Sequence, residues 1–118
     1  MTELAKLAVE RHAEIQVVRI AGEVDISNAG KLEADISDAV PNDAAGLVID
    51  LSDTGFLDSA GIRMLFELGQ RLGGRRQEVA VVVPPESLIR QSLVIVEVEQ
   101  ALPMHDTLDD AVDALRRG

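Results

Sequence analysis

Short apolar runs alternate with segments of helical periodicity along this chain. Two apolar runs, residues 4–9 and 15–20, predict a pair of strands joined by a polar turn, and Gly22 is expected to end the second strand. The run at 46–51 is short and apolar, which is typical of a strand covered on both faces. A similar run at 79–83, closed by two prolines, predicts another buried strand.

Between these runs, apolar residues recur at the spacing of amphipathic helices. The first predicted helix follows Ser27 or Asn28, either of which can serve as its N-cap, and stops at Pro41. The second spans residues 59–72, where a broad apolar arc faces a charged side and a glycine pair ends the helix. Residues 86–96 predict a third helix, although several β-branched residues near its end favour extended structure.

The end of the chain predicts a short strand at 101–104 and a last helix capped by Asp106 or Thr107. The resulting order is ββαβαβαβα. Strands separated by helices pair mainly in parallel, through right-handed crossovers. We therefore expect an α/β fold in which about four helices cover a mixed, mainly parallel sheet of about five strands. Residues 1–118 are expected to form a single domain.

The composition narrows the class of protein. With 118 residues, 47% of them hydrophobic, the chain can bury a core without disulfides, and the absence of cysteine excludes thiolate chemistry. A net charge of −10 disfavours contact with the phosphates of nucleic acid and favours partners with a basic face. The apolar runs are too short to span a bilayer and no signal peptide is visible, so we expect a cytoplasmic protein without membrane insertion.

The segment with the most informative chemistry is 49–61, where a predicted buried strand runs through an acidic loop to the start of a helix. Ser59 stands at that start, so its hydroxyl lies near unpaired backbone N–H groups and the positive end of the helix dipole. A phosphate there would be stabilised by the same groups, and Arg63 follows four residues later at nearly the same angle around the helix. The alternative is that Ser59 only caps the helix and Asp58 is a plain loop residue.

Two further segments extend this observation. Together with the loop before Ser59, they form three ordered motifs: Gly22-Glu23-Val24-Asp25, then Asp50-Leu51-Ser52 with Phe56-Leu57-Asp58-Ser59-Ala60-Gly61, then Ala101-Leu102-Pro103-Met104-His105-Asp106-Thr107-Leu108. These motifs resemble those of the STAS-domain anti-sigma factor antagonists, a family of bacterial regulatory proteins. The likeness therefore runs, in order, through nearly the whole chain.

The resemblance implies a partner-switching protein with the STAS fold, which is not an enzyme and needs no cofactor. In this family the unphosphorylated antagonist binds an anti-sigma factor and so frees a sigma factor. The anti-sigma factor is usually also a serine kinase, whose phosphorylation of the antagonist ends the interaction, and a metal-dependent serine phosphatase reverses it. The matching motif makes Ser59 the phosphoacceptor and makes Asp25 and Asp58 contacts to the kinase. Arg63 and Met64 are expected beside them at the partner surface.

Several of these residues keep a structural alternative. Asp25 is expected either to dock the kinase or to organise the turn before Ser27. Met64 lies at the edge of the apolar arc, where it either fills the core or offers an adaptable partner contact. Relatives often have glycine after the third helix, whereas this chain has Glu97. A left-handed cap would be strained there, so we expect that helix to end differently.

Other chemistry is disfavoured by the same sequence. Asp50, Asp53 and Asp58 do not match the acidic pair and lysine of a receiver domain, so we expect no metal site. A hydrolase built on Ser59 would need the first glycine of a nucleophile elbow, which is absent, and His105 is expected to be a surface or cap residue. The chain also lacks a phosphate-binding glycine loop of the Walker type.

Two other functions stay open. The first is a STAS subunit acting as an adaptor in a stress-signalling scaffold or a lipid-transport complex, and the second is a small-molecule sensor. The intact Asp58-Ser59 pair favours the phosphorylation-switched antagonist, because an adaptor does not need a phosphoacceptor. A sensor would need an enclosed pocket, and no glycine-rich or aromatic ligand loop is visible.

Overall fold

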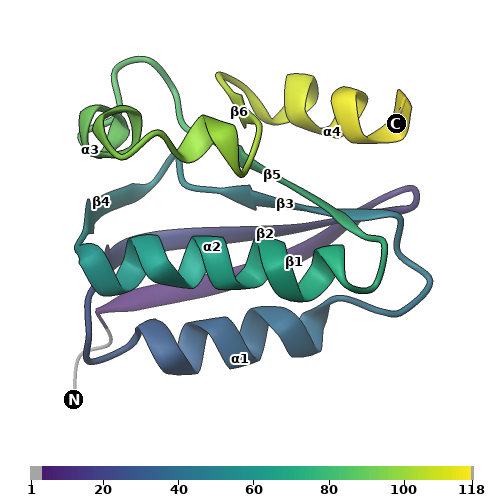
Figure 1. Ribbon diagram of the computed structural model, residues 1–118, viewed down its shortest axis with the longest axis horizontal. Coiled ribbons are helices and arrows are strands. Elements are labelled where there is room, and N and C mark those ends of the chain that lie inside the picture. Colours follow the sequence, from purple (N-terminus) through teal and green to yellow (C-terminus); the bar gives the residue numbers. More distant parts are fainter. Residues whose placement is uncertain (1–3, 118) are drawn as a thin grey trace.

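The computed structural model describes residues 4–117, which form one mixed six-stranded sheet with helices on both faces (Figure 1). The strands are β1 (Ala5–His12), β2 (Ile15–Val24), β3 (Gly46–Asp50), β4 (Thr54–Leu57), β5 (Glu78–Val82) and β6 (Met104–His105). β1 and β2 form an antiparallel hairpin, and all other neighbours pair in parallel. The strand order in the sheet is β1-β2-β3-β5-β6, and β4 pairs with the C-terminal end of β2. The expected α/β fold with a mainly parallel sheet is confirmed.

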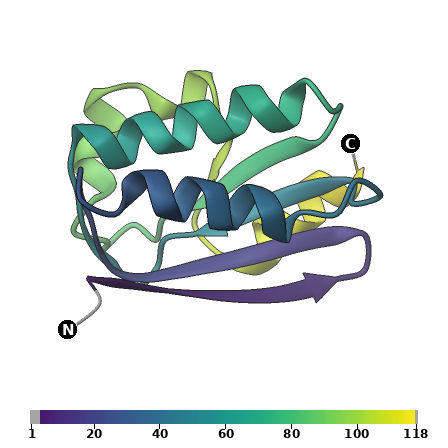
Figure 2. The same ribbon diagram turned by 90° about the horizontal axis from the view of Figure 1, so that it is seen from below.

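The helices divide between the two faces of the sheet. They are α1 (Ala29–Ala39), α2 (Ser59–Gly73), α3 (Arg90–Ile95) and α4 (Leu108–Arg117), with a short 3-10 turn, η1 (Val98–Gln100), after α3. α1 and α2 lie side by side over one face (Figure 2), and α4 covers the other. No helix within residues 4–117 is both long and apolar enough to cross a membrane.

Two core clusters result from the alternation of side chains along the central strands. On the face of α1 and α2, Val18 and Ile49 are fully buried, whereas Val17 and Val48 are fully buried on the face of α4. The central strands are thus covered on both sides, as their apolar runs predicted. The loops of the protein therefore begin at the ends of well-buried strands.

The sheet has one strand more than predicted, because residues 52–58 do not form a simple loop. Residues Thr54–Leu57 pair in parallel with β2, which continues past Gly22 to Val24 instead of ending there. Gly22 has a φ of 120°, the register shifts beside it, and a Cβ at this position would lie 2.2 Å from the carbonyl oxygen of Leu4. Glycine therefore bends β2 and lets it gain a second parallel partner.

The segment after β5 also differs from the prediction. α3 is shorter than the expected helix at 86–96, and the last strand is Met104–His105 instead of 101–104. Glu97 adopts the left-handed conformation, with φ 56° and ψ 43°. The expectation that glutamate would force a different ending is therefore wrong, because the chain keeps the left-handed cap after α3 without glycine.

Candidate phosphoacceptor site

The two loops expected at the partner surface lie next to each other because their strands end in register. β2 and β4 pair in parallel, with Val24 opposite Leu57. Asp25 and Asp58 directly follow these strands, so both stand where β2 and β4 end. This edge of the sheet lies on the left of Figure 1, where β4 is labelled. The register thus brings the Asp25 loop beside the start of α2.

Asp58 is the N-cap of α2 and holds both loops. Its Oδ1 accepts hydrogen bonds from the backbone N–H groups of Ala60 at 2.9 Å and Gly61 at 3.1 Å, which satisfies two donors of the first turn. Its Oδ2 accepts a third bond from the N–H of Ile26, at 3.2 Å. The alternative in which Ser59 caps the helix and Asp58 is a plain loop residue is therefore wrong.

A glycine lets the start of α2 approach the sheet closely. A Cβ on Gly61 would lie 2.5 Å from Leu57 Cδ1 and 3.1 Å from Val24 Cγ1, at the ends of β4 and β2. A side chain there would require either the Leu57 side chain or the first turn of α2 to move. Ser59 is therefore positioned by tight packing as well as by the Asp58 cap.

The Asp25 carboxylate organises its own loop. It accepts hydrogen bonds from the Ser27 hydroxyl and, at 2.8 Å, from the Ser27 N–H, and these bonds hold the pKa of Asp25 below its ordinary value. The Asn28 side chain accepts a bond from the Asp25 N–H and donates one to the Glu23 carbonyl, both at 2.9 Å. Asn28 is the N-cap residue of α1, as one of the two predicted alternatives had it, but its side chain is engaged in the preceding turn and forms no cap hydrogen bond.

The Ser59 hydroxyl differs from the other hydroxyls of these loops. Thr54 is buried and donates to a backbone carbonyl, while Ser27 and Ser52 each donate to a neighbouring aspartate. Ser59 is the first residue of α2 and is exposed, and its hydroxyl forms no hydrogen bond with any residue of the described segment 4–117. Among the hydroxyls of these loops, it is the one most available to another molecule.

Arg63 and Met64 were both predicted to lie at the partner surface, but their side chains face in different directions. Arg63 is exposed one turn after Ser59 and forms no ion pair with other residues in 4–117. Met64 is 1% exposed and belongs to the core cluster under α2. Its predicted contact with a partner is therefore wrong, because its side chain packs inside the protein and does not reach the surface.

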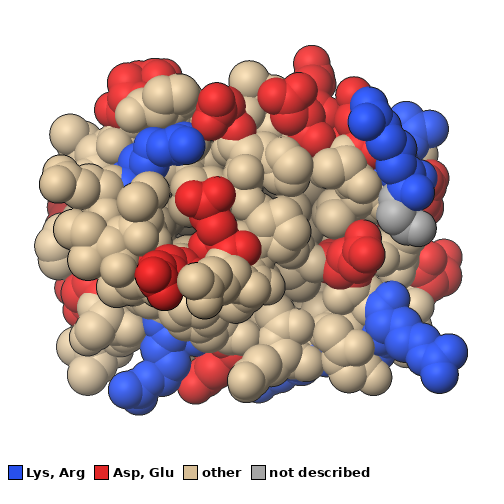
Figure 3. Space-filling view, turned by 45° about the horizontal axis from the view of Figure 1, so that its top comes forward, with Lys and Arg blue, Asp and Glu red and all other residues tan. Residues whose placement is uncertain are grey.

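Exposed apolar side chains around these loops were not predicted from the sequence. Ile26 is 84% exposed, Phe56 46% and Leu88 84%. A groove of about 250 Å³ runs between residues 52–55 and the segment 84–88, which carries Leu88. Figure 3 shows a broad uncharged area on the side where α3 and β4 lie in Figure 1. An isoleucine inside a polar turn was the available sequence signal for this surface.

Asp50, at the end of β3, has structural partners. Asp50 is 4% exposed, and its carboxylate accepts hydrogen bonds from Arg19 at 3.2 Å and from the Ser52 hydroxyl at 2.6 Å. Within residues 4–117, no three His, Asp or Glu side chains gather in a way that could hold a metal ion.

Comparison with known proteins adds independent information on this arrangement. Residues 6–111 match the STAS domain. The anti-sigma-F factor antagonist RsfB of Mycobacterium tuberculosis is 32% identical to this chain over 113 residues, which cover 95% of this chain and 90% of RsfB.

Solved structures agree with the sequence comparison. An anti-sigma factor antagonist from Mycobacterium paratuberculosis superimposes with a TM-score of 0.80 at 33% identity, over 95% of this chain and 94% of that one. The anti-sigma factor antagonist SpoIIAA, in its unphosphorylated form, has the same fold, with a TM-score of 0.75 at 19% identity over 96% of this chain and 98% of that one. This chain therefore belongs to the STAS domain family, and its similarities lie with the anti-sigma factor antagonists of that family.

Proposed function

We propose that this protein is an anti-sigma factor antagonist switched by phosphorylation of Ser59. In its unphosphorylated form it binds an anti-sigma factor that is also a serine kinase, and this binding frees a sigma factor. Phosphate on Ser59 ends the interaction, and a serine phosphatase restores the binding form. The similarity to RsfB and to the antagonist from Mycobacterium paratuberculosis, each over 95% of this chain, supports the proposal.

The observation that carries the proposal is the state of the Ser59 hydroxyl. A kinase can bind and phosphorylate this exposed hydroxyl without breaking a hydrogen bond. The hydroxyls of Ser27 and Ser52 would first have to break their hydrogen bonds to an aspartate. The product phosphate would lie at the N-terminus of α2, a helix of 15 residues, whose dipole stabilises negative charge. Arg63, exposed one turn away, is placed to pair with it.

The docking surface in this proposal joins acidic and apolar groups. Asp25 and Asp58 stand at the same edge of the sheet, with Ile26 and Phe56 exposed on the same two segments. Apolar side chains rimmed by charge are typical of interaction sites. A partner with an apolar centre and a basic rim fits such a surface, and the net charge of −10 attracts it at long range.

Incubation with the cognate anti-sigma kinase and ATP, followed by peptide mass mapping, tests the proposal. We expect one phosphate, on Ser59, and no phosphate in the Ser59→Ala variant. Ser92→Ala is the matched control, because Ser92 is another exposed helical serine, and it should be phosphorylated as fast as the unchanged protein. Principal phosphate on Ser27, Ser52 or Thr54 would contradict the proposal.

A further inference from the structure

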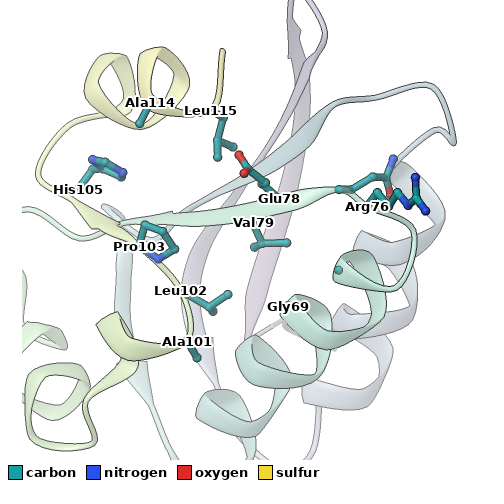
Figure 4. A pocket seen from close by; sticks show the side chains of 12 residues that line it. Gly69, Arg76, Glu78, Val79, Ala101, Leu102, Pro103, His105, Ala114 and Leu115 are labelled. Atoms are coloured by element: carbon teal, nitrogen blue, oxygen red, sulfur yellow. The ribbon is translucent and has the colours of Figure 1, made fainter. Parts of the chain in front are cut away.

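A cavity of about 540 Å³ lies at the other end of α2 from Ser59, and the proposed partner switch does not use it. It is bounded by the last turns of α2, the start of β5, the chain around β6, and α4 (Figure 4). Cavities of several hundred cubic ångströms are typical of small-molecule sites. The sequence did not indicate it, because its lining comes from four separate segments.

The floor of the cavity is an uncovered stretch of the edge of β5. The N–H groups of Val81 and Val83 donate to the carbonyls of Pro103 and His105, both at 2.9 Å, on the β6 side. Backbone groups of a parallel strand alternate in direction every residue, so the N–H and C=O of Val79 point to the same side as those of Val81. Within residues 4–117, the β5–β6 pairing begins only at Val81, so no strand lies opposite Val79.

Pro103 explains why the ladder stops. The next hydrogen bond of the parallel pattern would run from the backbone N–H of residue 103 to the Val79 carbonyl, and proline has no N–H. An adjacent donor and acceptor on Val79 are thus left facing the cavity. The exposed edge is one residue long, since the N–H of Gln77 already donates to Leu72 at 2.9 Å.

Two leucines that line the cavity, Leu102 and Leu115, lie on opposite faces of the sheet. Leu102 belongs to the core cluster of α1 and α2, and Leu115 to the cluster of α4. In Figure 4, Leu102 and Leu115 lie on either side of β5, with His105 toward one end of the cavity and Arg76 toward the other. A flat molecule lying in the plane of the sheet would contact both leucines and reach the edge of Val79.

Two polar atoms in the cavity lining lack partners. His105 Nε2 and Gln77 Oε1 are shielded from solvent and form no hydrogen bond with residues 4–117. The expectation that His105 is a surface or cap residue is therefore wrong, since it is half-buried in β6. A buried polar group without a partner costs free energy, so a ligand gains from satisfying Nε2 if the His105 ring turns toward it.

We propose that this cavity binds a small, neutral, planar molecule with a lactam-like edge. The N–H of the ligand donates to the Val79 carbonyl, its C=O accepts from the Val79 N–H, and the His105 ring turns so that Nε2 bonds a further polar atom of the ligand. A one-residue edge suits such a molecule better than a peptide strand, which needs several consecutive pairs. The ligand is neutral because Arg76 and Glu78 carry opposite charges at the rim, on a protein that is strongly acidic overall.

Titration of the isotope-labelled full chain with oxindole, a neutral bicyclic lactam, tests the site by amide NMR. We expect the largest shifts at Val79 and residues 101–105, and none at Ser59. N-methyloxindole has nearly the same shape without the N–H donor, so it should bind at least about fivefold more weakly. Equal binding of the two compounds, shifts centred elsewhere, or no shifts at millimolar oxindole would overturn the proposal.

The two histidines provide a matched pair of variants. His105→Phe keeps a ring and removes Nε2, whereas His12→Phe makes the same change on β1, at the opposite edge of the sheet. We expect the first to weaken oxindole binding about threefold or more and the second to leave it unchanged. If His105→Phe loses its dispersed amide spectrum, His105→Ser replaces it. Full affinity in a folded His105 variant would overturn the assigned contact.

Discussion

The carboxylate of Asp58 accepts a hydrogen bond from the backbone N–H of Ile26 at 3.2 Å, so the loop after β2 is tied to the start of α2. The other oxygen of this carboxylate caps the helix through two N–H groups. One side chain therefore fixes the Asp25 loop and Ser59 relative to each other. Asp58 therefore supports the proposed docking surface by holding the loop after β2 and the start of α2 in place.

Asp58→Ala should lower the free energy of unfolding by about 1–2 kcal/mol, because it removes a helix cap and leaves the Ile26 N–H without its acceptor. Urea unfolding followed by circular dichroism measures this. Asp58→Asn keeps an acceptor oxygen at the cap and should lose only part of that stability. Equal stability of Asp58→Ala and the unchanged protein would contradict the structural role.

Asp25→Ala should weaken binding to the anti-sigma kinase while the fold stays intact. Within residues 4–117, the Asp25 carboxylate bonds inside its own turn, to Ser27 and the Asn28 backbone, so its removal changes the docking surface without opening the core. Binding by calorimetry, with circular dichroism as the check on folding, distinguishes the two roles. A large drop in the melting temperature would show that Asp25 is mainly a structural residue of the turn.

The lowered pKa of Asp25 sets the sign of a pH effect. The Ser27 hydroxyl, and then its N–H, stabilise the charged carboxylate, so the unfolded chain binds more protons than the folded chain between the two pKa values. This contribution to stability is complete above the unfolded pKa and is lost as the pH falls through the folded pKa. An NMR titration should place the Asp25 midpoint below its ordinary value, and Ser27→Ala should move it upward. An unchanged midpoint would rule out the hydroxyl as the main cause.

The order of elements could be predicted because strand-like runs and helical periodicity alternate clearly along the chain. β4 could not, because its four residues include an exposed glycine and an exposed phenylalanine, Gly55 and Phe56, and show no apolar alternation. Its pairing also depends on the left-handed φ of Gly22, which the sequence presents only as a glycine. Tertiary pairing, not local preference, makes this strand.

In the candidate phosphoacceptor site, too, local preference could be read from the sequence and tertiary packing could not. Ser59 could be placed from local chemistry and from family resemblance, since a loop ending in Asp58-Ser59 before an apolar arc starts a helix. The inside position of Met64 depends on how α2 is rotated on the sheet, which packing decides. The exposure of Ile26 has the same origin, because it results from the turn that Asp25 and Asp58 hold together.

Gly61→Ala should destabilise the protein, although alanine favours helices. The added Cβ would lie 2.5 Å from Leu57 Cδ1, so the buried Leu57 side chain or the first turn of α2 must shift, at a cost of roughly 1–3 kcal/mol. Gly30→Ala is the matched control near the start of α1, where a Cβ meets nothing within 4 Å. It should be neutral or gain up to about 1 kcal/mol. Thermal unfolding compares them, and equal melting temperatures would contradict the close packing at Gly61.

Phosphate on Ser59 should release the partner by local charge, without refolding the domain. Phosphorylation adds about −1.5 to −2 charges at neutral pH. At an effective dielectric constant near 20, a like charge about 5 Å away costs roughly 3 kcal/mol, which is on the order of a hundredfold in affinity. Ser59→Asp should show part of this loss, and Ser59→Ala should bind the kinase but not be released by ATP. Added salt should reduce the loss, because the site is exposed.

Amide NMR of the phosphorylated protein tests how far the effect travels. Shifts should be confined to residues 53–66 and, through the bond between Asp58 and the Ile26 N–H, to residues 24–28. In Asp58→Asn, whose side chain is uncharged and keeps one acceptor oxygen, the shifts at 24–28 should shrink while those near Ser59 persist. Shifts that spread through β1 and α4 would contradict the local mechanism, because the hydrogen bonds of the Asp58 carboxylate within residues 4–117 go to neither element. An allosteric switch would then have to replace it.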